Sequence, residues 1–179
     1  QLSLRRCDLS ALCRDAVQQA ETHAPAGSAK FIVQVPEHAD ALIDTRLVRT
    51  AIYNLLTNAL RVTPEDGEIT VSLTDTRDFV TIAVADTGPG LDPAKFDDLL
   101  SGWRRTTSMD DYRALVPLVN QIAQAHGGRL LLTQREGGGS VLHLCLAHLP
   151  HTLEDDLFRA PTIIEDGYTA EEIEFSILE

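Results

Sequence analysis

The sequence is poor in cysteine, in aromatic residues and in long apolar runs. It has three cysteines with no CxxC pair, so we expect reduced thiols in a cytoplasm-like compartment. The histidines His143, His148 and His151 lack metal-ligand spacing. No apolar stretch approaches the roughly 20 residues of a membrane-spanning helix, and no signal peptide is present. These absences predict a soluble, cytoplasmic segment, although the full-length protein could carry a membrane anchor elsewhere.

Positive charge is also scarce. The 179 residues include 15 Lys and Arg against 27 Asp and Glu, a formal net charge of −12. Without a basic stripe, nucleic-acid binding and direct membrane contact are not expected. Residues 151–179 hold nine acidic side chains and one basic, which is two thirds of the excess. We therefore expect a domain over residues 1–150 and an acidic tail over 151–179 that docks on the domain or on a partner.

The chain starts with Gln1, and its only methionine is Met109. We therefore expect it to be a segment of a longer protein. With 44% hydrophobic residues, the segment has enough apolar side chains for one domain with an ample core.

The most informative stretch is a helix predicted between Leu47 and Thr63. Asn54, Asn58 and Arg61 form a polar stripe on it at spacings of i, i+4 and i+7. Asn is unfavourable inside helices because its amide competes for backbone groups, so the stripe indicates a site. Amide oxygens suit hydrated Mg²⁺ and a guanidinium suits phosphate, while a solvated polar face is the alternative. The opposite, apolar face predicts core residues: Val48, Ile52, Leu55, Leu56 and Ala59.

The remaining pattern alternates helices with strands. Residues 92–113 have weak periodicity and predict a partly helical, mobile loop. The tail fits both a helix and a strand. Elsewhere we expect a short strand at residues 2–4, helices over 9–20 and 115–126, strands over 30–35 and 41–43, and hairpins over 69–84 and 129–147.

Three motifs follow one another in a specific order. They are Asn54-x-x-x-Asn58, then Asp86-Thr87-Gly88-Pro89-Gly90, and, after a loop, Ala125-His126-Gly127-Gly128. This order resembles the ATP-binding catalytic domain of bacterial sensor histidine kinases, in the superfamily that also holds gyrase-type and Hsp90-type ATPases. The resemblance covers residues 1–149. It implies a two-layer α/β sandwich in which helices cover one face of a mixed sheet.

The resemblance also implies roles for the matching residues. Asn58 would ligate Mg²⁺ and be the catalytic residue, and Asn54 and Arg61 would line the phosphates of ATP. Asp86 would accept a hydrogen bond from the adenine amino group, which suits a carboxylate because it only accepts. Its alternative is a strand-end residue that caps the next turn. Gly88 and Gly90 would let the backbone approach the base, and their alternative is plain turn glycines.

The loop and the last motif add further candidates. Phe96, Leu99, Leu100 and Trp103 match the apolar F-box, and a simple core is compatible with the same residues. Lys95, Arg104 and Arg105 could counter phosphate charge or be solvated surface. His126 is expected to be a helix C-terminal residue favoured by the helix dipole.

The sequence departs from the family at Arg113-Ala114-Leu115-Val116, where the G2 box has Gly-x-Gly-x. Those glycines expose backbone N–H groups to a triphosphate. Their loss, together with Asp110 and Asp111 nearby, predicts weak or altered ATP binding and a short, repurposed lid. Arg113 could replace the lost contacts with a charged side chain.

We therefore expect the ATP-binding domain of a two-component sensor histidine kinase. It would pass the γ-phosphoryl group to a His on upstream dimerisation helices of the same protein, with a response regulator as second partner. Those helices are absent from this sequence, so the segment alone is not expected to autophosphorylate. One alternative is a pseudokinase that serves as a docking module for a regulator. Another is a serine kinase of the same superfamily that resembles anti-sigma factors.

Overall fold

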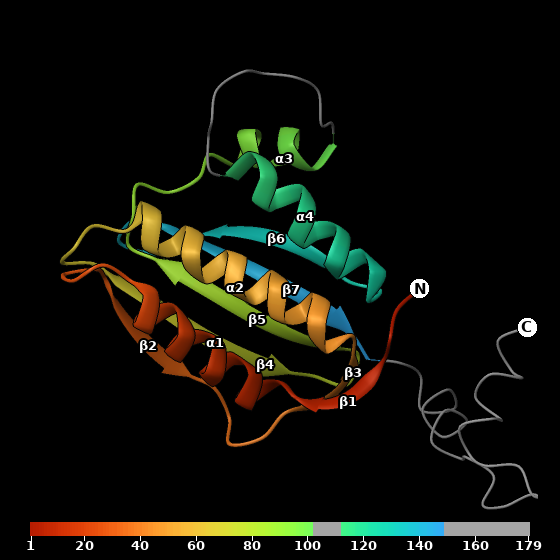
Figure 1. The fold of residues 1–179 in the computed structure, drawn as a ribbon. Helices are drawn as coiled ribbons and strands as arrows, with labels where there is room; N and C mark the ends of the chain where they lie inside the picture. The colour runs from red at the N-terminus through yellow and green to blue at the C-terminus, as the bar shows by residue number, and fades with distance from the viewer. Residues whose placement is uncertain (102–111, 149–179) are drawn as a thin grey trace, which may run out of the picture. The chain divides into compact units, whose positions relative to one another are not determined.

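The computed structural model describes residues 1–101 and 112–148, without the side chains of 112–114. The polypeptide alternates short strands with four helices over this range (Figure 1). The elements in chain order are β1 (Arg5–Asp8), α1 (Leu9–His23), β2 (Lys30–Gln34), β3 (Asp40–Ile43), α2 (Thr45–Val62), β4 (Glu68–Asp75), β5 (Phe79–Asp86), α3 (Pro93–Ser101), α4 (Tyr112–Ala125), β6 (Arg129–Gln134) and β7 (Ser140–Ala147).

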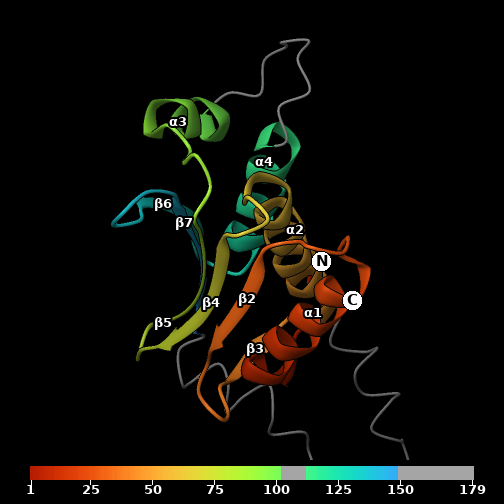
Figure 2. The ribbon, with the colours of Figure 1, turned by 90° about the vertical axis from the view of Figure 1, so that its left-hand side faces the viewer.

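The strands form a mixed five-stranded sheet in the order β2-β4-β5-β7-β6, and a separate two-stranded pair, β1-β3. Strand β2 is parallel to β4, and the other neighbours in the large sheet are antiparallel. Helices α1, α2 and α4 lie side by side on one face of this sheet (Figure 2). The predicted two-layer α/β fold with a mixed sheet is therefore confirmed.

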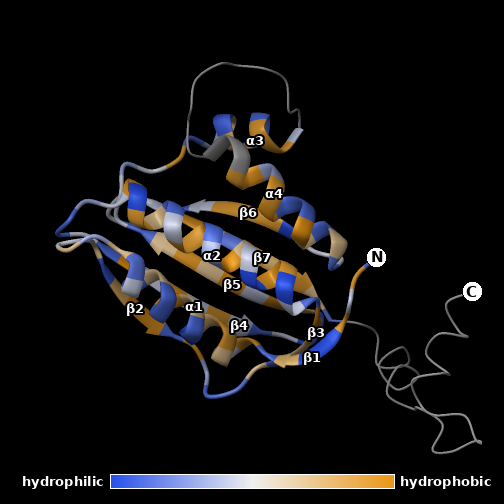
Figure 3. Ribbon diagram, in the orientation of Figure 1, coloured by the Kyte–Doolittle hydropathy of each residue, from blue (hydrophilic) through white to orange (hydrophobic). Residues whose placement is uncertain are grey.

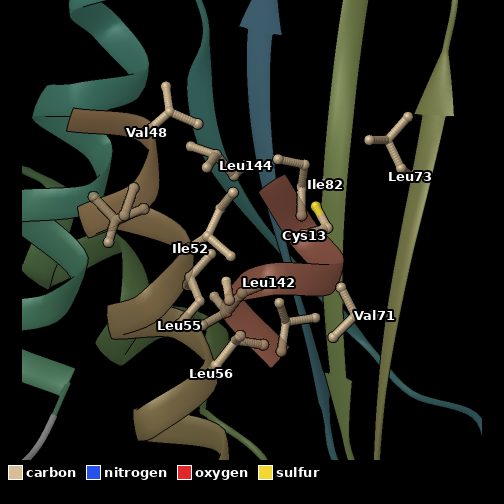
Figure 4. Packing of buried hydrophobic residues seen from close by; sticks show 14 of the residues in the cluster. Cys13, Val48, Ile52, Leu55, Leu56, Val71, Leu73, Ile82, Leu142 and Leu144 are labelled. Atoms are coloured by element: carbon tan, nitrogen blue, oxygen red, sulfur yellow. The ribbon is translucent and has the colours of Figure 1, made fainter. Parts of the chain in front are cut away.

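The core fills the space between the helices and the sheet. Hydrophilic and hydrophobic residues alternate along the helices (Figure 3), and the buried residues of α1 and α2 are mostly apolar. Ile52 and Leu55 of α2 lie opposite Leu142 and Leu144 of β7 (Figure 4). All five residues predicted for the apolar face of α2 are buried. Each large aliphatic side chain buried in this way contributes about 1.5 to 3 kcal/mol, so α2 is anchored by this face.

An aspartate precedes each of the first two helices, a position where a carboxylate can accept from the free backbone N–H groups. Asp8 caps α1 by accepting from the backbone N–H groups of Ser10 and Ala11. Asp44 caps α2 by accepting from the N–H of Leu47. Thr63 ends α2 in an extended conformation, as expected of a residue before proline. The Asn-bearing helix therefore has the boundaries that its flanking residues predict.

Several boundaries differ from the prediction, and α1 extends to His23, beyond the expected 9–20. The first strand is Arg5–Asp8 and not residues 2–4, because β3 pairs with residues 5 to 8. Helix α4 starts at Tyr112, so Pro117 lies inside it and removes one intrahelical hydrogen bond. Within 92–113, α3 supplies the expected helical part, and residues 102–111 and the tail lie outside the described residues. Among the helices that the structure describes, none is long and apolar enough to cross a membrane.

Candidate functional site

The polar stripe of α2 contains a buried amide oxygen without a hydrogen-bond partner. Asn58 is 3% exposed, and within the described part of the chain its Oδ1 accepts no hydrogen bond. An unsatisfied buried polar atom costs about 1 to 3 kcal/mol, so this oxygen indicates a ligand. Asn54 lies one turn earlier and is oriented by its Nδ2, which donates to the carbonyl oxygen of Thr50 at 2.8 Å. Arg61 lies in the last turn with an exposed side chain.

Asp86 is the last residue of β5 and is 4% exposed. Its Oδ1 accepts a hydrogen bond from the backbone N–H of Gly88 at 2.9 Å, so the carboxylate also caps the turn. Burial raises the pKa of this carboxyl, against the lowering effects of the Gly88 and Ser140 N–H groups and of the Arg135 charge. A carboxylate offers about four acceptor positions, so capping leaves room for a donor on a ligand.

The turn after Asp86 meets the C-terminal end of α2. A β-carbon on Gly88 would lie 2.7 Å from the carbonyl oxygen of Val62 and 2.9 Å from Oδ1 of Asp86. Only glycine fits where these two backbone segments come so close together. Gly90 has a φ of +83°, a conformation that L side chains rarely adopt. The structure thus brings the end of the Asn-bearing helix beside the turn that follows the buried carboxylate.

The sequence alone did not identify the β6–β7 hairpin as part of this site. The hydroxyl of Ser140 accepts from the backbone N–H of Leu91 at 2.6 Å. Gln134 Nε2 donates to the carbonyl oxygen of Leu91 at 3.0 Å. At Gly139, a side chain would collide with the backbone oxygen of Asp86. The one sequence signal was a glycine run and a serine at the start of a strand, which predicts a hairpin but not the element that it braces.

The other predicted residues divide into three groups. Phe96 is buried, and Leu99 and Leu100 pack partly buried against the core, so these F-box candidates are core residues. Lys95 lies on α3 and is half-buried. Trp103, Arg104 and Arg105 lie outside the described residues, and Arg113 lies on α4 with its side chain undescribed.

The place of the missing glycines has a structural role. Leu115 and Val116, at the start of α4, are 6% and 0% exposed and belong to the hydrophobic core. By the resemblance, Leu115 stands at the second glycine position of the G2 box, so its side chain adds buried apolar area where glycine would add none. The helix gains packing at the position where the family exposes bare backbone.

Magnesium, if bound, needs few protein ligands here. The described residues contain no group of three His, Cys, Asp or Glu side chains that could hold a metal ion. Mg²⁺ is commonly held by one or two protein oxygens together with phosphates and water. Asn58 Oδ1, buried and without a hydrogen bond, fits that limited role.

Comparisons with known proteins identify the family of this chain. Residues 43–151 match the family described as histidine kinase-, DNA gyrase B- and HSP90-like ATPases. The adaptive-response sensory kinase SasA of Gloeothece citriformis is 32% identical over 143 residues, covering 77% of this chain and 36% of SasA. The chain thus spans about a third of the length of the curated relatives it matches.

Solved structures show the same fold. The nucleotide-free catalytic domain of the histidine kinase ThkA superposes with a TM-score of 0.73 at 20% identity, covering 83% of this chain and all of that domain. Full-length ShkA in complex with AMPPNP gives a TM-score of 0.71 at 22% identity, covering 84% of this chain and 32% of ShkA. The chain belongs to the histidine kinase-, DNA gyrase B- and HSP90-like ATPase family and is an ATP-binding catalytic domain of the histidine-kinase type.

Proposed function

We propose that this chain binds ATP together with Mg²⁺ in the site between α2 and the turn after Asp86. The observation that carries the proposal is the buried, unpaired Oδ1 of Asn58. An oxygen kept without a partner costs stability unless a ligand completes it. Asp86 would accept from the adenine amino group, and Asn54 and Arg61 would contact the phosphates. Bound Mg²⁺ would offset the negative charge of the phosphate oxygens.

Titration calorimetry of the 179-residue chain with ATP, with and without Mg²⁺, tests this proposal. Wild type is expected to bind Mg–ATP more tightly than ATP in EDTA. Asn58→Ala should remove most of that Mg²⁺ dependence, and Asp86→Asn should weaken binding at least about tenfold, the effect of about 1.4 kcal/mol. Asn120→Ala is the matched control, because it removes an amide from α4 that bonds to Leu130. Unchanged Mg–ATP binding by Asn58→Ala would refute the role of Asn58.

The affinity is expected to be low. Leu115 packs in the core at a position where the resemblance implies a glycine whose backbone contacts the triphosphate. The ThkA catalytic domain, whose fold this chain shares, can be titrated beside it as a reference. We expect Mg–ATP to bind this chain more weakly than a histidine-kinase domain with both G2 glycines. Equal affinities would contradict the proposed weakening.

We further propose that the bound ATP donates its γ-phosphoryl group to a His on dimerisation helices upstream in the same protein, and that a response regulator then receives it. The support is the match to sensor kinases, which extend well beyond the part that this chain covers. The protein with its upstream region should incorporate ³²P from γ-labelled ATP, and the 179-residue chain alone should not. Labelling of the 179-residue chain alone would contradict the proposal that the phosphorylated His lies in the upstream region.

The pseudokinase alternative, a docking module without nucleotide, is not favoured. The matched relatives are kinases, and the unpaired oxygen of Asn58 has no use in a pure docking surface. The acidic tail over 151–179 remains a proposed contact for a partner.

A further inference from the structure

The buried ring of His126 links the end of α4 to Asp44, the residue that precedes α2. The residue directly follows α4 and is 8% exposed. Its Nε2 accepts a hydrogen bond from the backbone N–H of Asp44 at 3.0 Å, and its Nδ1 lies 2.8 Å from the carbonyl oxygen of Ile122. A backbone N–H only donates and a carbonyl only accepts, so the ring is neutral with its proton on Nδ1. The sequence predicted a residue favoured by the helix dipole, whereas the structure shows a neutral link.

Asp44 is the point at which this link reaches the Asn-bearing helix. Its Oδ1 accepts from the N–H of Leu47 at 3.2 Å and so caps α2. Its Oδ2 accepts from the backbone N–H of Ser3 at 3.0 Å. The bonds from Ser3 and Leu47 lower the pKa of this carboxyl, in that order of effect. One residue therefore holds the N-terminal segment, the start of α2 and, through His126, the end of α4.

The N-terminal segment is paired along its length with the strand that leads into Asp44. Strand β1 is antiparallel to β3, with Arg5 opposite Ile43 and Asp8 opposite Asp40. The N–H of Leu9 also donates to the carbonyl oxygen of Ala39 at 2.8 Å. Residues 5–8 are therefore joined by a backbone ladder to the strand that precedes Asp44, and Ser3 is joined to the Asp44 carboxylate itself.

Helices α2 and α4 run in opposite directions, and their joined ends lie beside β1 and β3 (Figure 1). Asn58 is 14 residues from Asp44, about 20 Å along the helix. The apolar face of α2 is buried in the core over most of this length, so we expect the helix to act as a rigid element. The position of Asn58 relative to α4 thus depends on the contact at the far end.

We propose that His126 is a positioning residue for the nucleotide site. By holding Asp44 against the end of α4, it sets the position of Asn58, and it passes the placement of residues 3–8 to the same helix pair. The inference depends on the proposed function, because nucleotide affinity is its readout. A positional change at the start of the domain would then change the affinity for ATP without touching the site itself.

The test is calorimetry with Mg–ATP on the 179-residue chain, at a temperature where all variants are shown by circular dichroism to be folded. His126→Leu, which leaves the Asp44 N–H unpaired, should weaken binding about tenfold. His126→Gln offers an amide oxygen in place of Nε2 and should restore affinity to within about threefold of wild type. His143→Leu is the matched control, since it removes a histidine bonded to Thr133 on the sheet and should bind as wild type.

Coupling to the N-terminal segment is tested by Ser3→Pro, which removes the N–H that Asp44 accepts. The single variant should bind about threefold more weakly. Combined with His126→Leu, it should add less than about 1.5-fold, because residues that act as one unit are not additive. A long-range ¹H–¹⁵N spectrum of wild type should show a protonated Nδ1 and an unprotonated Nε2 in His126, and Ser3→Pro should shift the Nε2 resonance.

The outcomes separate the two proposals. If wild type binds no Mg–ATP, the proposed nucleotide site fails, and this inference fails with it. If wild type binds and His126→Leu binds equally well while losing thermal stability, His126 is only structural and the inference alone is overturned. Fully additive effects of Ser3→Pro and His126→Leu would overturn the coupling.

Discussion

No side chain fits between Gly88 and the carbonyl oxygen of Val62, where a β-carbon would be only 2.7 Å from that oxygen. This contact joins the turn after the buried carboxylate to the last residue of the Asn-bearing helix. The close approach of these two backbone segments leaves no room for a side chain at position 88 unless Val62 or Asp86 shifts.

Gly88→Ala is predicted to damage both stability and binding. The added β-carbon must displace Val62 or Asp86, and overpacking of this kind costs about 1 to 3 kcal/mol. Urea unfolding and titration with Mg–ATP measure the two effects. Gly137→Ala is the matched control: its φ of +84° makes alanine strained at a cost of about 1 kcal/mol, but nothing lies within 4 Å of the added atom. A fully stable, fully binding Gly88→Ala would disprove the close contact.

Asn58→Ala is predicted to leave the free energy of unfolding of the nucleotide-free chain almost unchanged, within about 1 kcal/mol. The substitution removes a buried oxygen that has no partner, which offsets the lost packing. Asn120→Ala should instead cost about 1 to 2 kcal/mol, because its Oδ1 accepts from the N–H of Leu130 at 3.0 Å. Urea titrations of both variants without nucleotide measure the two changes in the free energy of unfolding. A larger loss for Asn58→Ala than for Asn120→Ala would show that Asn58 is structural.

Ser140→Ala is predicted to loosen the turn that carries Gly88 and Gly90. The N–H of Leu91 would lose its acceptor in a buried position, at a cost of about 1 to 3 kcal/mol. Mg–ATP binding should weaken as the turn loses its brace. Ser28→Ala, which removes an exposed hydroxyl bonded to Pro25, is expected to change neither property. Chemical denaturation and calorimetry of the pair test the prediction, and equal behaviour of the two variants would contradict it.

Asp8 is predicted to contribute stability that depends on pH. A hydrogen bond with His38 and backbone N–H groups, chiefly that of Ala39, lower the pKa of Asp8 to about 2, opposed by partial burial. A carboxyl with a lowered folded-state pKa stabilises the fold above its unfolded value of 3.8, and this contribution is lost as the pH falls toward 2. Because His38 is largely exposed, the contribution at pH 7 is about 1 kcal/mol.

Urea unfolding at several pH values measures this contribution. Asp8→Ala should be less stable than wild type at pH 7, and the difference should shrink between pH 4 and pH 2. The control is Asp15→Ala on the exposed side of α1, whose effect should be small throughout. A difference between Asp8→Ala and wild type that stays constant down to pH 2 would contradict the assignment.

Much of the fold could be predicted from local patterns. The apolar face of α2, the caps at Asp8 and Asp44 and the alternation in β4 and β5 are short-range features, so periodicity and capping chemistry identify them. The start of β1 could not be found in this way, because it depends on a partner strand 35 or more residues away. The start of α4 was missed for a different reason, since a proline inside a helix contradicts the local rule.

The site was predicted only in part, because some of its residues acquire a role only through contacts with distant elements. Asn58 and Asp86 violate local preference or stand at a motif, so the sequence reveals them. Ser140 and Gln134 are ordinary in sequence, and only the hairpin that packs on the turn gives them a role. Likewise, the sequence shows that Leu115 stands where the resemblance implies a glycine, but only the packed structure shows that its side chain is buried in the core.

By itself the sequence determined which side chains are available: two helix-borne amides, one carboxylate before a glycine turn, and a histidine at a helix end. The tertiary structure decided which of them meet. It buried Asn58 Oδ1 without a partner and placed Gly88 close to the carbonyl oxygen of Val62. It also brought the ring of His126 within hydrogen-bond distance of the backbone N–H of Asp44, 82 residues away. The reason is that chemical type and local geometry are encoded in neighbouring residues, whereas desolvation and long-range hydrogen bonds exist only once distant elements pack together.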